Sequence, residues 1–342
     1  GHSKAFRLTE TGFEWVGDYE ITADEVLGGI APKVNKIEHA IPMMQALYDG
    51  GIDAAEITFR SEHAKEAIEI VSKTIPNMLV GAGTVLNVEQ AKAACDAGAS
   101  FIVTPGFNAK VVEWCIENNI PVLPGISTAS ELETALSYGI TTVKFFPAES
   151  SGGAKKIKDL SAPYQHVKFL PTGGIGLSNM HEYLSLPSVL AIGGSFMIPE
   201  NLVNDENWEE LSKLSRQAVK TMLDFKLTHL GINHENEEQS KQTAQTLCDL
   251  FNFTFYNKPK SKFAGVGFEL LNSKGRGVNG HIGIYTPYPE RALYHLEKKG
   301  VHGINETITR NKRTNKINFV YLDKEIAGFA IHLINPDLKM EV

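Results

Sequence analysis

The chain has 342 residues, of which 42% are hydrophobic and 21% are charged, and its formal net charge is −7 at pH 7. This composition is typical of a globular protein, and the length suffices for one large core and a second domain. No apolar run approaches the roughly 20 residues that cross a bilayer. Acidic side chains stand near the start where a basic and then apolar leader would lie, so we expect a cytoplasmic protein without a membrane partner.

Neither the basic residues nor the cysteines indicate a macromolecular partner or a thiolate site. Near residues 258–262 and 312–316 the lysines and arginines form short clusters without interleaved aromatic side chains, so we expect a solvated surface and no nucleic-acid partner. The cysteines lie far apart and lack C-x-x-C spacing. Small buried side chains are therefore favoured over disulfides or a thiolate metal site.

From about residue 27, short apolar runs alternate with amphipathic stretches, as in repeated βα units. A helix is expected over 37–49 and another over 108–118, and strands are expected near 28–33, 53–58, 78–84, 100–104, 121–124, 141–145, 167–171 and 189–194. Eight such units in about 200 residues predict an α/β fold, a (β/α)8 TIM barrel over 24–225, preceded by an N-terminal extension over 1–23. The alternative is a doubly wound sheet with a dinucleotide site at Gly81-Ala82-Gly83, but no third glycine follows at the required spacing.

The second expected strand carries polar residues on one face. Residues two apart in a strand share a face, so Glu56, Thr58 and Arg60 are predicted to point into the barrel and toward its C-terminal mouth. A carboxylate there can move protons, and a guanidinium can hold a substrate carboxylate with two hydrogen bonds. An internal ion pair between Glu56 and Arg60 is the alternative interpretation.

The sixth expected strand places a lysine among apolar residues, in Thr142-Val143-Lys144-Phe145-Phe146-Pro147-Ala148-Glu149. An amine with poor hydration is favoured in its neutral form, which is a nucleophile toward carbonyls. The pattern therefore predicts imine chemistry at Lys144. The alternative is a lysine whose stem is buried while its ammonium reaches water.

Two glycine-rich turns follow the seventh and eighth expected strands, at Thr172-Gly173-Gly174 and at Gly193-Gly194-Ser195. Glycines let backbone amides approach an anion closely, and the loops after these two strands often bind phosphate in barrel enzymes. We interpret the turns as a phosphate subsite.

The barrel segments resemble those of 2-keto-3-deoxy-6-phosphogluconate (KDPG)/4-hydroxy-2-oxoglutarate (KHG) aldolases over residues 24–223. The resemblance rests on segments in the family's order and spacing, which are Glu56-Ile57-Thr58-Phe59-Arg60, Val80-Gly81-Ala82-Gly83-Thr84-Val85, Thr104-Pro105-Gly106, Leu123-Pro124-Gly125-Ile126-Ser127-Thr128, Val143-Lys144-Phe145-Phe146-Pro147-Ala148-Glu149, Pro171-Thr172-Gly173-Gly174-Ile175 and Ile192-Gly193-Gly194-Ser195.

The resemblance implies a class I aldolase that needs no cofactor, acts on a small 2-keto acid and assembles as a homotrimer. It implies that Lys144 forms the Schiff base, that Glu56 is the general acid and base, and that the remaining site residues bind substrate. Arg60 and Thr84 would hold the carboxylate of the pyruvyl half, Pro105 and Phe146 would line the pocket, and Thr172, Gly173, Gly174, Gly193 and Ser195 would receive the phosphate. The sequence departs from the family at Lys33, where many relatives have arginine.

The sequence leaves two alternatives open for the barrel. KDPG and KHG share the pyruvyl half, and a phosphogalactonate-type aldolase differs only at C4, so the preferred substrate is not predicted. A phosphate-binding isomerase or decarboxylase would explain the glycine turns, but it leaves Lys144 and Glu56 without a role.

After an amphipathic helix expected near 205–223, the pattern changes at Phe225-Lys226. Residues 227–338 predict a smaller α+β domain in which one order of elements occurs twice. Thr228-His229-Leu230-Gly231-Ile232 precedes a helix near 236–250 and strands near 252–257 and 265–272, and Gly280-His281-Ile282-Gly283-Ile284 precedes a helix near 288–299 and further strands. We interpret this as two βαβββ modules.

The duplicated tail resembles the glyoxalase/vicinal-oxygen-chelate superfamily, in which four equivalent positions often bind a divalent metal. The resemblance implies a site of His229, Glu269, His281 and His332, with His332 where a carboxylate is usual. Such a set suits Zn²⁺ or Ni²⁺. The alternatives are histidines used only for packing, and a binding or oligomerisation module without catalysis.

Overall fold

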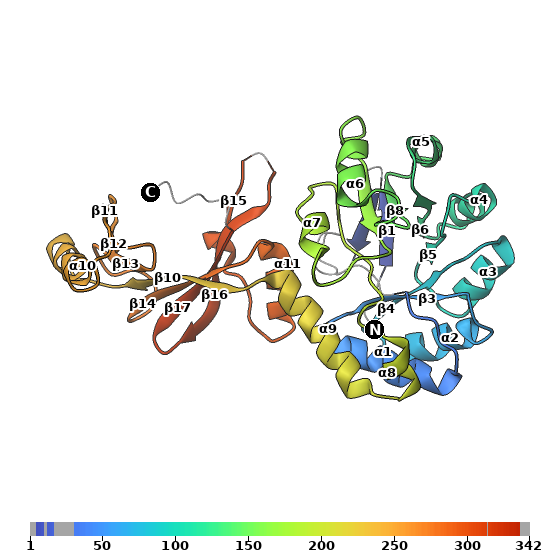
Figure 1. The fold of residues 1–342 in the computed structure, drawn as a ribbon, viewed down its shortest axis with the longest axis horizontal. Coiled ribbons are helices and arrows are strands. Elements are labelled where there is room, and N and C mark those ends of the chain that lie inside the picture. The colour runs from blue at the N-terminus through green and yellow to red at the C-terminus, as the bar shows by residue number, and fades with distance from the viewer. Residues whose placement is uncertain (1–4, 10–11, 17–30, 313, 336–342) are drawn as a thin grey trace. The chain divides into compact units, whose positions relative to one another are not determined.

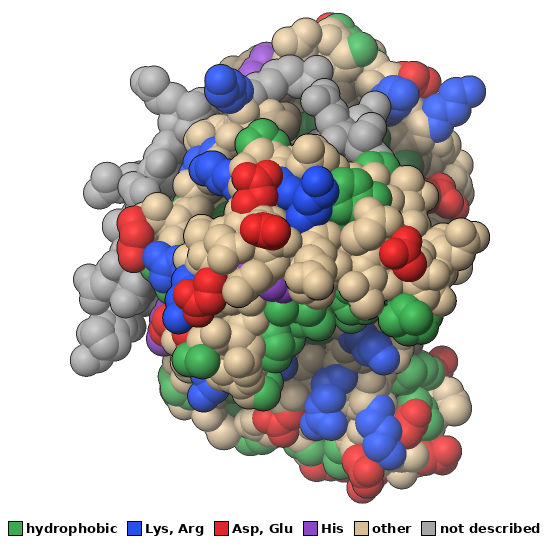
Figure 2. All heavy atoms as spheres, turned by 90° about the vertical axis from the view of Figure 1, so that its left-hand side faces the viewer, with side chains coloured by type: hydrophobic (Ala, Val, Ile, Leu, Met, Phe, Trp, Pro, Cys, Tyr) green, Lys and Arg blue, Asp and Glu red, His purple; other side chains and the backbone are tan. Residues whose placement is uncertain are grey.

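The computed structural model describes residues 5–9, 12–16, 31–312 and 314–335, and they fall into two compact units divided between Met222 and Leu223 (Figure 1). Each unit is described by itself. Within the described residues, no helix is long and apolar enough to span a bilayer. On the face drawn in Figure 2, acidic and basic side chains are intermingled.

The first unit opens with an antiparallel hairpin of β1 (Ala5–Thr9) and β2 (Gly12–Val16). Parallel strands and helices then alternate, and Figure 1 shows helices α1 to α7 around the strands. The strands are β3 (Ala54–Thr58), β4 (Leu79–Gly83), β5 (Ile102–Val103), β6 (Val122–Leu123), β7 (Gly125–Ile126), β8 (Thr142–Phe145) and β9 (Lys168–Pro171). The helices are η2 (Ile37–His39), α1 (Ala40–Asp49), α2 (Ala64–Thr74), α3 (Val88–Asp96), α4 (Ala109–Glu117), α5 (Ala129–Ser137), α6 (Gly153–Ser161), α7 (Met180–Leu184), α8 (Glu200–Asn204) and α9 (Trp208–Leu223).

The parallel strands lie side by side in chain order, β3-β4-β5-β6 in one sheet and β7-β8-β9 in the next. Neighbouring strands that follow the chain order are typical of a barrel. In a doubly wound sheet the chain adds strands first on one side of its starting strand and then on the other. Pro124 separates β6 from β7, although the amide of Lys144 still donates to Pro124 O at 2.9 Å. Because proline has no amide to donate, the ladder is interrupted there.

Two expected barrel strands are not regular strands where the structure describes them, and the prediction was wrong there; residues 28–30 lie outside the described residues. Of the segment 28–33 the structure describes residues 31–33, which form no strand, although Pro32 O accepts from the Thr58 amide at 3.0 Å. The segment 189–194 pairs with β9 through isolated bridges at Val189 and Gly193. Pro32 and Pro171 lack the N–H that a continuous ladder needs at these places.

Several helices of the first unit begin at side-chain caps. Asn87 and Asn108 accept hydrogen bonds from the amides three residues on, and Thr128 forms a capping box with Glu131. Each cap satisfies an amide that the first helical turn leaves without a partner. Each cap fixes the residue at which a helix begins after the loop that follows a strand. These loops lie at the C-terminal end of the barrel strands, where the polar residues gather.

The second unit is built on an eight-stranded sheet with the order β11-β12-β13-β10-β14-β17-β16-β15. Its elements in chain order are β10 (Lys226–Ile232), α10 (Glu237–Phe251), β11 (Phe255–Asn257), β12 (Ser261–Ala264), β13 (Phe268–Leu271), β14 (Gly280–Tyr285), α11 (Pro289–Glu297), η3 (Asn305–Thr307), β15 (Thr309–Arg310), β16 (Ile317–Ile326) and β17 (Phe329–Ile334). The strand β12 lies between the two strand ranges predicted for this region.

The two central strands of this sheet, β10 and β14, are antiparallel to each other. Each is parallel to its other neighbour, β13 or β17. The helix α10 covers one face of its half, where Ala244, Cys248, Ala264 and Leu270 form a buried apolar cluster. The opposite face of the central strands is left for polar side chains.

Candidate active site

Lys144 and Glu56 meet inside the first unit. Lys144 Nζ donates to Glu56 Oε1 at 2.7 Å, and each residue is only 5% exposed. They come from β8 and β3, which are not neighbours in either sheet, so the contact crosses the interior. A buried ammonium beside one carboxylate can pass its proton directly to it, which leaves a neutral amine as a nucleophile.

Gly83, on β4, makes room for this pair. A Cβ atom at Gly83 would lie 3.2 Å from Glu56 Cδ and 3.3 Å from its Cγ, closer than most packed carbon contacts. Any larger residue would press on the Glu56 side chain. The glycine therefore lets the carboxylate lie along the inside of the neighbouring strand.

Arg60 and Thr84 lie beyond the ends of their strands. Arg60 is exposed in the turn after β3, and its Nε donates to Thr58 Oγ1 at 3.4 Å. Thr84 is half-buried with a φ of 55°, which is an outlier for a β-branched residue. The alternative of an internal ion pair between Glu56 and Arg60 was wrong, since Glu56 pairs with Lys144 from mid-strand.

Pro105 and Phe146 are both half-buried at the same ends of their strands. Lys144 Nζ lies 5.2 Å from the centre of the Phe146 ring. A Cβ at Gly125 would lie only 2.2 Å from Pro105 O, so the loop carrying Pro105 packs directly on the backbone of β7. Both residues therefore lie on loops that follow strands close to the lysine.

The two glycine turns lie next to each other. Thr172 and Gly193 form a β-bridge, and the Gly193 amide donates to Pro171 O at 2.8 Å. Gly173 and Gly174 have φ values of 105° and 80°, which glycine adopts without strain. Thr172 is buried, whereas Ser195 is exposed.

The sequence argument missed Asn179, which holds the first of these turns. Its Oδ1 accepts from the Gly176 amide at 2.8 Å, and its Nδ2 donates to Gly174 O at 3.1 Å. The signal that could have identified it is an asparagine a few residues after a glycine turn and just before a helix.

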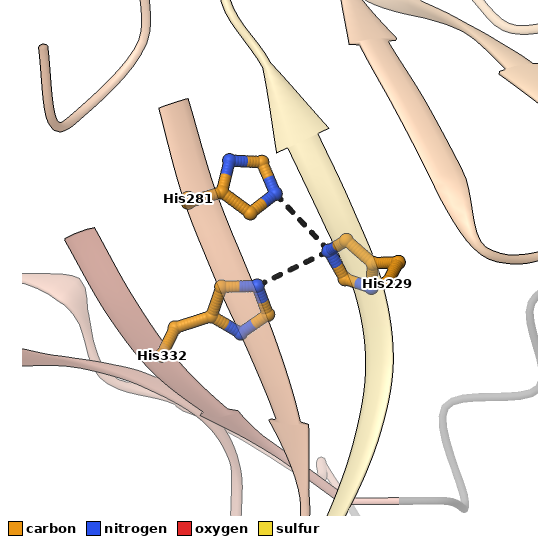
Figure 3. Close-up of side chains that lie close together, drawn as sticks. All are labelled: His229, His281 and His332. Atoms are coloured by element: carbon orange, nitrogen blue, oxygen red, sulfur yellow. Dashed lines mark hydrogen bonds between the residues drawn. The ribbon is translucent and has the colours of Figure 1, made fainter. Parts of the chain in front are cut away.

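Four polar residues meet in the second unit, one from each of its four central strands. His229 lies on β10, Glu269 on β13, His281 on β14 and His332 on β17. His229 Nε2 lies 3.0 Å from His281 Nε2 and 3.2 Å from His332 Nε2, as Figure 3 shows. Glu269 Oε2 lies 3.2 Å from His281 Nε2 and 3.5 Å from His229 Nε2.

Two glycines make room for these imidazoles. A Cβ at Gly231 would lie 2.2 Å from the His281 ring, and one at Gly283 would lie 2.5 Å from the His229 ring. Both glycines face the histidine of the neighbouring strand, because Gly231 pairs with His281 and Gly283 pairs with His229. No other residue type leaves this space.

Burial favours the uncharged forms of His229 and His332. It lowers the pKa of His332 to about 3, assisted by His229 and His281, and it lowers the pKa of His229 although Glu269 opposes it. Burial alone would raise the pKa of Glu269, but hydrogen bonds from His281 and Ser261, followed by electrostatic interaction with His229 and His281, lower it instead. The cluster therefore places one carboxylate beside imidazoles of which His229 and His332 favour the neutral form.

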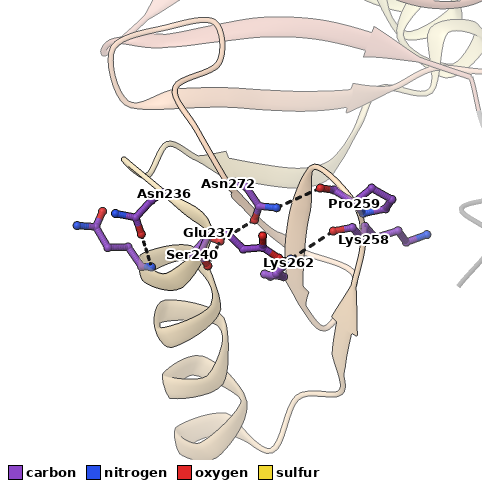
Figure 4. Close-up of polar contacts among 8 residues, drawn as sticks. Asn236, Glu237, Ser240, Lys258, Pro259, Lys262 and Asn272 are labelled. Atoms are coloured by element: carbon purple, nitrogen blue, oxygen red, sulfur yellow. Dashed lines mark hydrogen bonds and ion pairs between the residues drawn. The ribbon is translucent and has the colours of Figure 1, made fainter.

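A buried lysine in the same unit has a structural role. Lys262 on β12 is 2% exposed, and its Nζ donates to Glu237 Oε1 at 2.6 Å (Figure 4). Ser240 donates to Asn272 Oδ1 at 2.7 Å, and Asn272 Nδ2 donates to Pro259 O at 3.2 Å. These contacts join the start of α10 to the β11–β12 hairpin.

The fold and the interior pair define a barrel protein equipped for imine chemistry at a buried lysine. The family model for KDPG and KHG aldolases matches residues 21–214. The match spans more than half of the chain, so the protein belongs to this family of carbon–carbon lyases.

Individual relatives agree with this assignment. The KHG/KDPG aldolase of Escherichia coli (strain K12) is 42% identical over 207 residues, which are 59% of this chain and 97% of the relative. The 2-dehydro-3-deoxy-phosphogluconate aldolase of Treponema pallidum (strain Nichols) is 46% identical over 187 residues, which are 55% of this chain and 89% of the relative.

A solved structure is also similar. It is the KDPG aldolase of Legionella pneumophila with pyruvate captured at low pH as a covalent carbinolamine intermediate, and it is 36% identical with a TM-score of 0.56. The alignment covers 57% of this chain and 96% of that one.

Proposed function

We propose that the barrel cleaves KDPG to pyruvate and glyceraldehyde 3-phosphate, or KHG to pyruvate and glyoxylate, through a Schiff base on Lys144. The observation that supports this most is the 2.7 Å contact between Lys144 Nζ and Glu56 Oε1 in the barrel interior. The relatives named as aldolases for these two substrates support the choice of substrate class.

The chemistry follows from the pair. Glu56 takes a proton from the ammonium, and the free Lys144 amine attacks C2 of the 2-keto acid to give a carbinolamine. Glu56 returns this proton to the carbinolamine hydroxyl, which leaves as water, and the products are an iminium and the Glu56 carboxylate. The C3–C4 bond then breaks, its electron pair moves into the iminium to give an enamine, and Glu56 removes the C4 hydroxyl proton through a water as the aldehyde leaves. Protonation at C3 and hydrolysis release pyruvate and restore the amine. The iminium is the electron sink, so the cycle needs no cofactor.

The other barrel residues bind the two ends of the substrate in this proposal. Arg60 and Thr84 hold the carboxylate of the pyruvyl half, and Pro105 and Phe146 line the pocket beside Lys144. The adjacent glycine turns receive the phosphate, with contacts from Thr172, Gly173, Gly174, Gly193 and Ser195. Their proximity through the bridge between Thr172 and Gly193 supports a single anion subsite.

Borohydride trapping tests the proposal. Incubation with pyruvate and borohydride should add one reduced pyruvyl group to the peptide that contains Lys144, and Lys144→Met should lose both the adduct and aldol cleavage. Lys168→Met is the matched control, because Lys168 lies on the neighbouring strand β9 with its Nζ bonded to Pro187 O. An adduct on another residue, or a Lys144→Met variant with a tenth of the wild-type turnover, would contradict the assignment.

A comparison of three substrates distinguishes the alternative activities. A phosphogalactonate-type aldolase would favour the C4 epimer of KDPG, so specificity constants for KDPG, its epimer and KHG decide among them. A phosphate-binding isomerase or decarboxylase would cleave none of the three and would give the Lys144–Glu56 pair no role.

For the second unit we propose two βαβββ modules of the glyoxalase/vicinal-oxygen-chelate type that hold one divalent metal, Zn²⁺ or Ni²⁺. The donors would be His229, His281 and His332 through Nε2 and Glu269 through Oε2. The repeated order of a strand, a helix and three strands supports the modules.

The donor set fits a metal ion. Nitrogen ligands about 2.0–2.1 Å from a tetrahedral zinc lie roughly 3.4 Å from one another, and the Nε2 separations here are 3.0 and 3.2 Å. Ligation needs neutral imidazoles, and burial favours that form at His229 and His332. The metal would supply Lewis-acid chemistry, while the hydrogen bond from Ser261 Oγ to Glu269 Oε1 at 2.7 Å would leave Oε2 for the metal.

Metal analysis of protein purified without chelator tests the site. We expect about one metal per chain and a higher melting temperature with added zinc or nickel, since a ligand at 100 times its Kd stabilises by about 2.7 kcal/mol. His229→Ala should lose this rise, whereas His302→Ala, an exposed histidine of the same unit, should keep it. No bound metal and no shift would contradict the site and favour a binding or oligomerisation module.

A further inference from the structure

The first glycine turn rests on a side chain that the proposed reaction does not use. A Cβ at Gly174 would lie 2.5 Å from Glu149 Cγ and 2.7 Å from Glu149 Cβ. The amides of Ala148 and Glu149 donate to Thr172 O at 2.8 Å and Gly173 O at 3.1 Å. The turn therefore lies directly against the stem of Glu149 over its whole length.

The carboxylate of Glu149 is itself held by a buried tyrosine. Tyr183 on α7 has no exposed surface, and its hydroxyl donates to Glu149 Oε1. Burial, followed by the hydrogen bond to Glu149, raises the pKa of Tyr183, so the phenol stays protonated and remains the donor. The same oxygen of Glu149 lies 3.6 Å from where a Cβ at Gly153 would stand, at the start of α6.

Asn179 holds the other side of the turn through Gly174 O and the Gly176 amide. The turn is thus fixed from both sides, and its Gly174 amide donates to no other residue in the part of the chain that the structure describes. An amide held in place without an acceptor is what an incoming anion requires. An unpinned Glu149 carboxylate beside that amide would instead compete with the anion and repel it.

We propose that Glu149 and Tyr183 are positioning residues that set recognition of the phosphate end of the substrate, and that Tyr183 does so by holding the Glu149 carboxylate away from the glycine turn. This inference rests on the proposed function. It adds two residues that touch neither Lys144 nor the pyruvyl half, so their effect should fall on phosphorylated substrate alone.

The test compares KDPG with KHG in Tyr183→Phe. We expect KM for KDPG to rise about tenfold while kcat for both substrates and KM for KHG stay within about twofold of wild type, and inhibition by inorganic phosphate should weaken in parallel. Glu149→Gln keeps an oxygen that accepts from Tyr183 and should retain the KDPG preference better than Glu149→Ala does.

Tyr164→Phe is the matched control, because Tyr164 also donates to a glutamate, Glu133 at 2.6 Å, but precedes β9 at the opposite end of the strands. Equal changes for KDPG and KHG, or no change for either, would overturn the positioning role. Pyruvate trapping on Lys144 in each variant separates this result from a failure of the aldolase proposal, which would abolish trapping in the wild type as well.

Discussion

Lys144 and Glu56 depend on each other because, among the described residues, each forms its buried ion pair with the other. Each group would lose several kcal/mol of hydration in the interior, and the opposite charge at 2.7 Å offsets this loss. A pair of this kind is held for its chemistry more than for stability, since apolar residues of equal volume often stabilise as well.

Glu56→Gln should lower kcat for aldol cleavage by about 10²–10⁴-fold, the usual contribution of a positioned proton-transfer group. The amide keeps the volume and a hydrogen bond to Lys144 but accepts no proton. Steady-state cleavage rates check this, with Glu133→Gln, an exposed carboxylate bonded to Tyr164, as control. A kcat within tenfold of wild type would show that another group moves the proton.

Gly283→Ala should destabilise the second unit by about 1–3 kcal/mol, because the added methyl group overlaps the His229 ring. It should also abolish the rise in melting temperature with added metal. Gly267→Ala is the control in the same unit, in the turn before β13, since a Cβ there meets nothing within 4 Å. Chemical denaturation of both variants measures the difference, and equal stability would show that His229 has room to move.

The sequence predicted which residue types meet at the barrel site, but not all of their partners. The alternation of side chains in a strand placed Glu56 and Lys144 inside, because period two depends on the backbone alone. It did not reveal that Glu56 pairs with Lys144 and not with Arg60, which depends on where β3 ends. Asn179 and Tyr183 contact the glycine turn and Glu149, which lie in loops, and no periodic pattern predicts the course of a loop.

At the scale of elements, the strands β3 to β6, β8 and β9 and the helices α1 and α4 were predicted close to their bounds, because apolar runs and amphipathic stretches are local signals. The prolines were underestimated. Pro32, Pro124 and Pro171 each interrupt a ladder, and so residues 31–33 form no strand while the fifth and eighth barrel strands are broken or irregular. In the tail, β12 escaped prediction because Lys262 and Ser261 make it polar on both faces.

The capping box of α5 gives a prediction at this scale. Burial raises the pKa of Glu131, but the hydrogen bonds from Ser127 and Thr128 together lower it by more. The net pKa therefore lies below its usual value. A depressed carboxyl pKa stabilises the fold above the unfolded pKa of about 4.3, and this contribution is lost as pH falls through the folded pKa.

Glu131→Gln should therefore cost more stability at pH 7 than at pH 3, with about 1 kcal/mol expected at pH 7 for a weakened cap. Urea unfolding at the two pH values checks this. Glu133→Gln, two residues further along the same helix, controls for general charge effects. A cost that is equal at both pH values would show that the carboxylate charge of Glu131 contributes nothing to the cap.

At the scale of the molecule, the chain joins a barrel to a second unit with its own sheet and its own polar centre. The relative from Escherichia coli is matched over 97% of its length by 207 residues of this chain, so a barrel of this size is a complete protein elsewhere. The homotrimer that the sequence resemblance implies stays a prediction.

A chain ended after Phe225 should keep its turnover per barrel within about twofold, because domains with separate cores fold on their own. Cleavage assays and light scattering of the shortened and full-length chains test this together. Loss of the assembly with unchanged turnover would assign the tail to oligomerisation. Loss of turnover in a folded barrel would contradict the independence of the two units.

Gly231 and Gly283 each leave room for a histidine of the other half of the tail, and this couples the two halves. Each half gives two of the four clustered polar residues, and each supplies the space that a ring from the other half fills. A larger side chain at either glycine therefore displaces a histidine of the opposite half. If the proposed modules arose by duplication, this seam limits how far one can diverge without a compensating change in the other.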